Sequence, residues 1–262
     1  MGFLTDLIES IRRELDQHPP DDVALMARAT AMPPARPFED ALRAAAPPAL
    51  IAEVKRASPS AGEIAADANP SVLARAYEAG GAAAVSVLTE PRHFHGSLAD
   101  LQAVRSSTSL PVLRKDFLIH PSQLIESRAA GADAVLLIVG ALTDSQLQAL
   151  LSAADDLGLG TLVETHSDED LRRALATDAP VIGVNARNLE TLDVDVAGAR
   201  ERIAALPEDR LGVLESGIAG RGDVDAAIAA GASAILVGEA LMRADDPARA
   251  VRKLVWKELR TT

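Results

Sequence analysis

The chain has 262 residues, 24% of them charged, and its 38 acidic side chains exceed its 26 basic ones to give a net charge of −12. A length near 250 residues accommodates one large α/β domain, because barrel folds exceed the usual domain size of ~100–200 residues. The acidic balance disfavours nucleic acid and anionic membrane surfaces as partners, since both are bound by clustered cations. An anionic small substrate would need a local basic pocket.

Cysteine is absent, which excludes a disulfide framework, a thiol nucleophile and cysteine-ligated zinc. The first twenty residues carry acids early and lack the basic-then-apolar order of a signal peptide. No stretch approaches the ~18 uninterrupted apolar residues of a membrane span. We therefore expect a cytoplasmic protein.

The first 48 residues form a distinct segment. Leu4, Leu7 and Ile8 begin an apolar pattern at helical spacing, and a proline-rich stretch with a short helical patch at 38–42 follows. We interpret residues 1–48 as an N-terminal helical extension, and we expect it to pack over the mouth or the flank of the domain formed by residues 49–262.

From residue 49 onward, short apolar runs alternate with amphipathic segments. The runs are 49–56, 82–90, 111–117, 132–139, 160–166, 181–187, 210–217 and 232–240. The expected helices are 70–81, 121–131, 143–157, 167–177, 196–206, 221–230 and 246–260. Eight apolar runs in this alternation predict a (β/α)8 TIM barrel with parallel strands buried on both faces. An open doubly wound sheet is the alternative, and the expected GxGxxG turn is absent.

Lysine is scarce, with four lysines against 22 arginines, and Lys55 and Lys115 lie in apolar strand patterns. Arginine cannot release its proton in a protein, whereas a desolvated lysine can titrate, so these two lysines are candidates for chemistry. Snorkelling or salt-bridged lysines are the alternative interpretation.

Polar residues also end several predicted strands, where the active site of a barrel of this kind lies. The candidate catalytic residues are Glu53, Lys55, Lys115, Glu164, Asn185, Glu215 and Ser216. Lysine and glutamate in a partly desolvated mouth can have pKa values moved toward neutrality, so that one group donates a proton and another accepts it. This pattern predicts acid–base chemistry with no metal and no cofactor; a structural salt-bridge cluster is the alternative.

Glycine-containing loops after the seventh and eighth strands indicate a phosphate site, because backbone N–H groups can reach an anion there. Gly217 and Gly238 are the candidates, and the Ser-Pro-Ser-Ala-Gly loop at 58–62 could close over a ligand. His93 and His95 make only a weak metal site. Tyr77 and Trp256 are interpreted as packing residues, and His18, His120 and His166 as helix-boundary residues.

Six segments together carry a family resemblance: IAEVKRASPSAGEI, VLRKDF, LVETHS, VNARNLETLDVD, LESGI and LVGEALMR. In order and spacing from residue 49 to 243 they resemble indole-3-glycerol phosphate synthase, a carboxy-lyase of tryptophan biosynthesis. The resemblance implies that 1-(2-carboxyphenylamino)-1-deoxyribulose 5-phosphate is cyclised, decarboxylated and dehydrated to indole-3-glycerol phosphate.

The resemblance also implies residue roles. Lys115 is similar to the general acid of ring closure, Lys55 to a ligand of the substrate carboxylate that can also assist proton transfer, and Glu164 to the partner in dehydration. Glu53, Asn185, Glu215 and Ser216 match residues that orient substrate or stabilise the intermediate. How Lys55, Lys115 and Glu164 divide the protons stays open. The remaining substrate-binding and phosphate-binding candidates are Arg56, Ser58, Phe117, Leu136, Arg187, Gly217, Gly238 and Glu239, the last through its backbone N–H.

Two other functions stay open at this stage. Lys115 could be the Schiff-base nucleophile of an aldolase, or the barrel could bind a sugar phosphate without turnover. Phosphoribosylanthranilate isomerase, a related barrel, requires a catalytic cysteine that this chain lacks. We expect a monomer.

Overall fold

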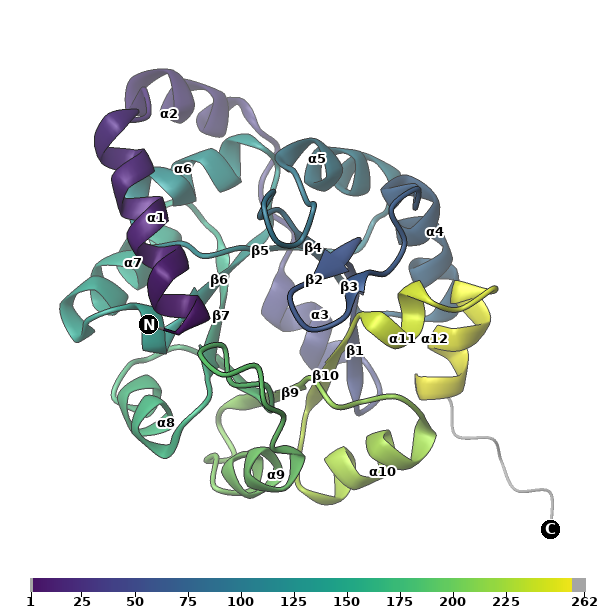
Figure 1. Ribbon diagram of the computed structural model, residues 1–262. Coiled ribbons are helices and arrows are strands. Elements are labelled where there is room, and N and C mark those ends of the chain that lie inside the picture. The colour runs from purple at the N-terminus through teal and green to yellow at the C-terminus, as the bar shows by residue number, and fades with distance from the viewer. Residues whose placement is uncertain (1, 256–262) are drawn as a thin grey trace, which may run out of the picture.

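The computed structural model describes residues 2–255 of the chain. Within that range eight parallel strands close into a barrel in which each strand pairs with its neighbours in the sequence (Figure 1). The strands are β1 (Ala49–Val54), β4 (Ala84–Leu88), β5 (Val112–Lys115), β6 (Ala134–Ile138), β7 (Gly160–Thr165), β8 (Val181–Asn185), β9 (Leu211–Glu215) and β10 (Ala234–Val237). The predicted TIM barrel is confirmed. The alternative of an open doubly wound sheet is wrong, because β1 pairs with both β4 and β10 and so closes the ring.

Helices surround the barrel and return the chain from the end of one strand to the start of the next. They are α4 (Pro70–Gly80), α5 (Leu98–Ser107), α6 (Pro121–Ala129), α7 (Asp144–Asp156), α8 (Asp168–Leu175), α9 (Val196–Ala204), α10 (Arg221–Ala229) and α12 (Pro247–Val255). No helix between residues 2 and 255 has the length and hydrophobicity to span a bilayer.

The sequence pattern did not predict α5, and it extended the last helix to residue 260. Only Leu101 and Val104 of α5 are buried, so the helix has little apolar stripe to detect; the side chain of Ser97 caps its first turn instead. Residues 256–260 of the expected last helix, with Trp256, lie outside the described part of the chain.

The extension wraps the barrel from end to end. Its helices are α1 (Phe3–Gln17), α2 (Asp22–Ala31) and α3 (Phe38–Ala44). In Figure 1, α1 lies at the near end of the barrel and α3 at the far end. Phe38 of α3 packs against Gly160, the first residue of β7, and Leu7 of α1 belongs to the same hydrophobic core as the strands. The extension therefore contributes to a core continuous with that of the barrel.

Helix α2 was not predicted. Its only buried residue is Ala29, so it has no apolar stripe that would mark a helix in the sequence. It packs against α6 on the outside of the barrel (Figure 1).

Two elements stand over the mouth of the barrel. After β1, the loop at 58–62 is part of a short antiparallel hairpin of β2 (Ala57–Ser58) and β3 (Gly62–Glu63). After β10, the short helix α11 (Glu239–Met242) begins directly at the end of the strand. These elements and the neighbouring strand ends form the walls of the site described next.

Candidate active site

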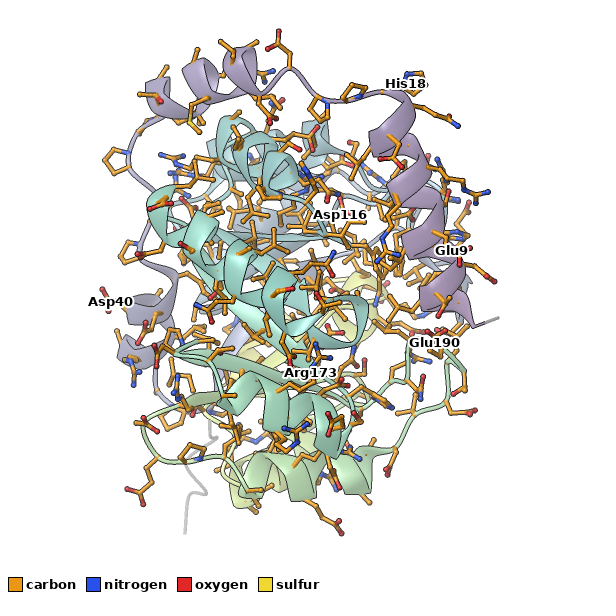
Figure 2. All side chains as sticks on the ribbon, turned by 90° about the vertical axis from the view of Figure 1, so that its left-hand side faces the viewer. Glu9, His18, Asp40, Asp116, Arg173 and Glu190 are labelled. Atoms are coloured by element: carbon orange, nitrogen blue, oxygen red, sulfur yellow. The ribbon has the colours of Figure 1, made fainter. Side chains whose placement is uncertain are left out.

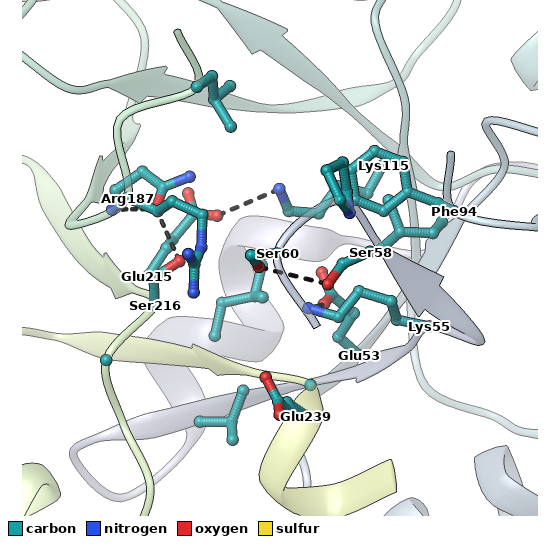
Figure 3. A pocket seen from close by; sticks show the side chains of 18 of the residues that line it. Glu53, Lys55, Ser58, Ser60, Phe94, Lys115, Arg187, Glu215, Ser216 and Glu239 are labelled. Atoms are coloured by element: carbon teal, nitrogen blue, oxygen red, sulfur yellow. Dashed lines mark hydrogen bonds and ion pairs between the residues drawn. The ribbon is translucent and has the colours of Figure 1, made fainter. Parts of the chain in front are cut away.

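A cavity of about 510 Å³ opens at the carboxyl ends of the barrel strands. The sequence-predicted site residues that line it are Glu53, Lys55, Ser58, Lys115, Phe117, Leu136, Asn185, Arg187, Glu215, Ser216, Gly217, Gly238 and Glu239 (Figure 3). Glu164 joins them through its contact with Lys115. The tertiary structure thus brings almost all of the candidates to one cavity.

Lys115 lies at the centre of the charged floor. Its Nζ donates a hydrogen bond to Glu164 Oε2 at 3.2 Å and forms an ion pair with Glu215 Oε2 at 3.5 Å. Figure 3 shows the Lys115 side chain extended toward Glu215. Lys115 and Glu215 are the last residues of β5 and β9, and Glu164 is the next-to-last residue of β7. These are alternate strands of the ring, and alternate strands place their inward side chains in one layer.

This charge cluster shifts two pKa values. Burial alone would lower the pKa of Lys115, but Glu164, Glu215 and Glu53 outweigh it and raise that pKa. Burial and repulsion from Glu164 raise the pKa of Glu215 well above its usual range, against the opposing effect of Lys115. The expectation of values moved toward neutrality is therefore wrong for Lys115 and correct in direction for Glu215. The carboxylates around Lys115 therefore favour its protonated form.

A second lysine–glutamate pair lies beside the first. Lys55 follows β1 directly, and its Nζ is 2.9 Å from Glu53 Oε1. The Lys55 side chain is 19% exposed, whereas the Glu53 side chain is 4% exposed, so the ammonium group lies nearer the opening. Lys55 is thus placed to meet an anionic group that enters the cavity, next to the hairpin that carries Ser58.

Two glycines leave room for these carboxylates. A Cβ at Gly183 of β8 would overlap the carboxylate of Glu215, and a Cβ at Gly238 would overlap that of Glu53. A side chain at either position would have to displace the buried carboxyl group from its lysine partner, because that group occupies the space where the side chain would start.

Gly183→Ala is expected to lower kcat about tenfold and to destabilise the fold by about 1–3 kcal/mol, because the methyl group displaces Glu215 from Lys115. Thermal unfolding and steady-state rates would measure both effects. Gly222→Ala in α10 is the matched control, since its added methyl group meets no described atom within 4 Å. Equal activity of the two variants would contradict the close packing around Glu215.

Asn185 and Ser216 build the turn beside the cluster. Ser216 Oγ donates to Asn185 Oδ1 at 2.8 Å, and the backbone N–H of Arg187 donates to the same oxygen at 3.0 Å. Ser216 has φ +66°, a left-handed conformation that is uncommon for a residue with a side chain, and Gly217 has φ +73°. Such strain persists where surrounding contacts enforce it, as the Asn185 amide does here.

The adjacent part of the rim, after β10, carries Gly238 and Glu239. The Glu239 carboxylate accepts from Arg243 Nε at 3.0 Å, so it is held by an arginine of its own helical turn. Arg243 also lines the cavity, which the sequence did not predict.

One predicted ligand lies elsewhere. Arg56 does not line the cavity; its guanidinium group pairs with Asp100 of α5, with Nη2 2.8 Å from Oδ1. The reason is the alternation of side chains at the end of β1, which sends Lys55 inward and Arg56 toward the surrounding helices. The prediction that Arg56 binds substrate is therefore wrong. Arg56 instead links the loop after β1 to α5.

An aromatic wall completes the cavity. Phe94 lies 6.1 Å from Phe117 between ring centroids, and Phe3 of α1 lies 6.4 Å from Phe117. Neither Phe3 nor Phe94 was among the sequence-predicted site residues. The pattern Phe-x-Gly-Ser in the loop after the second strand could have indicated Phe94, but no local signal marks Phe3, which comes far ahead of the barrel in the sequence.

The histidines have structural surroundings. His93 packs edge-on against Phe3, with 5.0 Å between ring centroids, and His120 caps α6. In the described range 2–255, no three histidine, aspartate or glutamate side chains are grouped as metal ligands would be. Tyr77 is buried, with its hydroxyl group donating to the backbone oxygen of Glu53 at 3.3 Å.

Residues 4–254 match the family model of indole-3-glycerol phosphate synthase. The chain belongs to the indole-3-glycerol phosphate synthase family. Among curated members, the synthase of Rhodococcus opacus is 48% identical over 259 residues, covering 97% of this chain and 95% of that protein. The synthase of Mycobacterium avium is 52% identical over 231 residues, covering 88% of this chain and 85% of that protein.

Solved structures of other barrels share the fold alone. A 3-hexulose-6-phosphate synthase superposes with a TM-score of 0.63 at 20% identity, over 79% of this chain and 97% of that one. A thiamine phosphate pyrophosphorylase from Pyrococcus furiosus superposes with a TM-score of 0.60 at 17% identity, over 83% and 96%. Membership of the synthase family makes the chain a carboxy-lyase of tryptophan biosynthesis that acts on a phosphate-containing small molecule.

Proposed function

We propose that the cavity converts 1-(2-carboxyphenylamino)-1-deoxyribulose 5-phosphate to indole-3-glycerol phosphate with Lys115 as the acid of ring closure. The observation that carries this proposal is the position of Lys115 Nζ between Glu164 and Glu215 on the floor of the cavity. The substrate combines an aryl carboxylate, a carbonyl group and a phosphate. The cavity offers an aromatic wall beside Lys55, a protonated lysine at its centre, and Arg187 with glycine loops at its rim.

Ring closure forms a bond between the aromatic carbon that carries the carboxylate and the ribulose carbonyl carbon. Negative charge develops on the carbonyl oxygen, and Lys115 donates the proton that makes it a hydroxyl group. The bond to the carboxylate then breaks, carbon dioxide leaves, and its electron pair restores the aromatic ring. Lys55, held by Glu53, binds the carboxylate before it leaves, and Phe117 and Leu136 flank the ring.

Dehydration completes the indole. A base removes a proton from the carbon next to nitrogen, and the new hydroxyl group leaves as water with a proton from an acid. Glu164, in contact with Lys115, is positioned to take part in this exchange. Glu215, Asn185 and Ser216 orient the substrate, while Ser58, Arg187, Gly217, Gly238 and the backbone N–H of Glu239 bind the phosphate.

The Schiff-base alternative is disfavoured by the charge around Lys115. A lysine that attacks a carbonyl needs a lowered pKa so that the free amine is present. The carboxylates raise the pKa of Lys115 instead. Borohydride with substrate should therefore fail to trap a covalent adduct.

We also propose the wider arrangement of the enzyme. Residues 1–48 serve as an extension of the catalytic barrel at 49–262, and the protein acts as a cytoplasmic monomer that binds neither nucleic acid nor membrane. The net charge of −12 supports the absence of the last two partners.

The activity is tested by supplying the carboxyphenylamino deoxyribulose phosphate in chelator-treated buffer and following the indole product by fluorescence. We expect turnover without added metal, because lysine and glutamate side chains supply the proton transfers. A folded protein that forms no product, or one that requires a metal ion, would contradict the proposed chemistry. Circular dichroism provides the control for folding.

A further inference from the structure

The loop between β8 and α9 contacts the first turn of α1 through Glu190. The backbone N–H of Phe3 donates to the Glu190 carbonyl oxygen at 3.3 Å, and that of Leu4 donates to the Leu189 carbonyl oxygen at 3.2 Å. The Thr5 hydroxyl group donates to Glu190 Oε1 at 2.6 Å, and the Thr5 N–H donates to Oε2 at 3.4 Å. Figure 2 shows Glu190 beside the first turn of α1.

These contacts replace a missing helix cap. The N–H groups of the first helical turn have no partners inside the helix, and a side chain just before the helix usually accepts from them. In α1 that position is Gly2, which has no side chain to offer. Glu190, far away in the sequence, supplies both the acceptor oxygens and a negative charge at the positive end of the helix dipole.

Glu190 is itself held in a defined turn. Asn188 Oδ1 accepts from the Glu190 N–H at 2.7 Å, and the Leu192 N–H donates to the Asn188 carbonyl oxygen at 2.8 Å. The Leu192 carbonyl oxygen then accepts from Arg187 Nη1 at 2.9 Å. One side of the turn therefore binds α1 while the other side orients the guanidinium group of Arg187.

The two elements that this contact joins, α1 and the loop after β8, both line the active-site cavity. Phe3 lines it from α1, and Leu189 and Leu192 line it from the loop, whereas Glu190 does not. The Glu190 carboxylate therefore binds α1 on the side of the cavity wall that faces away from the cavity. A loss of the contact would release Phe3 from Phe117 and loosen the turn that orients Arg187.

We propose that Glu190 is a positioning residue of the active site, whose carboxylate clasps the first turn of α1 and so fixes Phe3 and the Arg187 loop around the substrate. The proposal rests on the proposed function for the identity of the substrate. It gives the N-terminal extension a second role besides packing, since the extension supplies part of the cavity wall.

The first test compares the steady-state kinetics of Glu190→Ala and Glu190→Gln. Glu190→Ala is expected to raise KM about tenfold with kcat within about twofold, because the wall binds substrate and performs no chemistry. Glu190→Gln should stay within about twofold of wild type in KM, since its amide oxygen still accepts from Thr5. Glu9→Ala, which removes an exposed carboxylate from the same helix, is the matched control and should leave KM unchanged.

Thr5→Val removes the other partner of the shortest contact. It should raise KM by less than Glu190→Ala, and adding it to Glu190→Ala should cause little further change, because the two residues act through one contact. Thr5→Val also tests the clasp if Glu190→Ala fails to fold. A wild-type KM in Glu190→Ala, or a Glu190→Gln variant as impaired as Glu190→Ala, would overturn the proposal.

A second readout does not depend on activity. Hydrogen exchange of the Phe3, Leu4 and Thr5 amides should become faster in Glu190→Ala and stay as in wild type in Glu190→Gln and Glu9→Ala. If wild type itself shows no turnover, the proposed function fails while this exchange still tests the clasp. Unchanged exchange in Glu190→Ala would show that the carboxylate does not hold the helix.

Discussion

Lys115→Arg is expected to abolish turnover, with a loss of about 10³-fold or more in kcat, while the barrel stays folded. Arginine keeps the positive charge between Glu164 and Glu215, but it cannot release a proton to the developing alkoxide. The variant therefore separates the charge of the residue from its acidity. The rate is measured by the fluorescence of the indole product, the fold by circular dichroism, and substrate binding by titration.

Lys253→Arg provides the matched control, because Lys253 is an exposed residue of α12 outside the cavity. It should behave as wild type. Activity of Lys115→Arg within about tenfold of wild type would remove Lys115 from the role of acid and leave Lys55 or Glu164 as the donor.

Glu215→Gln is expected to lower kcat about 10²-fold and yet to raise the thermal stability of the protein at neutral pH. Burial and the neighbouring Glu164 raise the pKa of Glu215 in the folded state above its unfolded value. A group of this kind contributes most to stability below its unfolded pKa, and its contribution is lost as the pH rises toward the folded pKa. Glutamine does not ionise, so the stability of the Glu215→Gln variant does not fall with rising pH for this reason.

The stability difference should therefore depend on pH in one direction. Tm of Glu215→Gln should exceed that of wild type at pH 8, and the gap should narrow as the pH falls into the ordinary range of a carboxyl group. Glu208→Gln, at an exposed position, is the control. A gap that widens toward acid pH would mean that Lys115 stabilises ionised Glu215 more than burial and Glu164 destabilise it.

Much of the fold was predictable because it depends on local patterns. Each apolar run is bounded by turn residues and followed by a helix, and parallel strands joined by helices close into a barrel when eight units follow one another. Two helices that the pattern missed, α2 and α5, bury few side chains and so carry little periodic signal. The strand-end residues were predictable for a related reason, since the carboxyl ends of all parallel strands meet at one face.

The sequence by itself determined the barrel, the family and the set of polar residues at its mouth, because these follow from the order of residues along each βα unit. Only the tertiary structure decided what those residues face. It turned Arg56 toward Asp100, raised the pKa of Lys115 by surrounding it with three carboxylates, and brought Phe3 and Glu190 together from distant parts of the chain. Charge interactions and packing depend on distances between residues that are far apart in the sequence. These contacts and pKa shifts therefore follow only from the strand order, the side-chain directions and the distances of the folded chain.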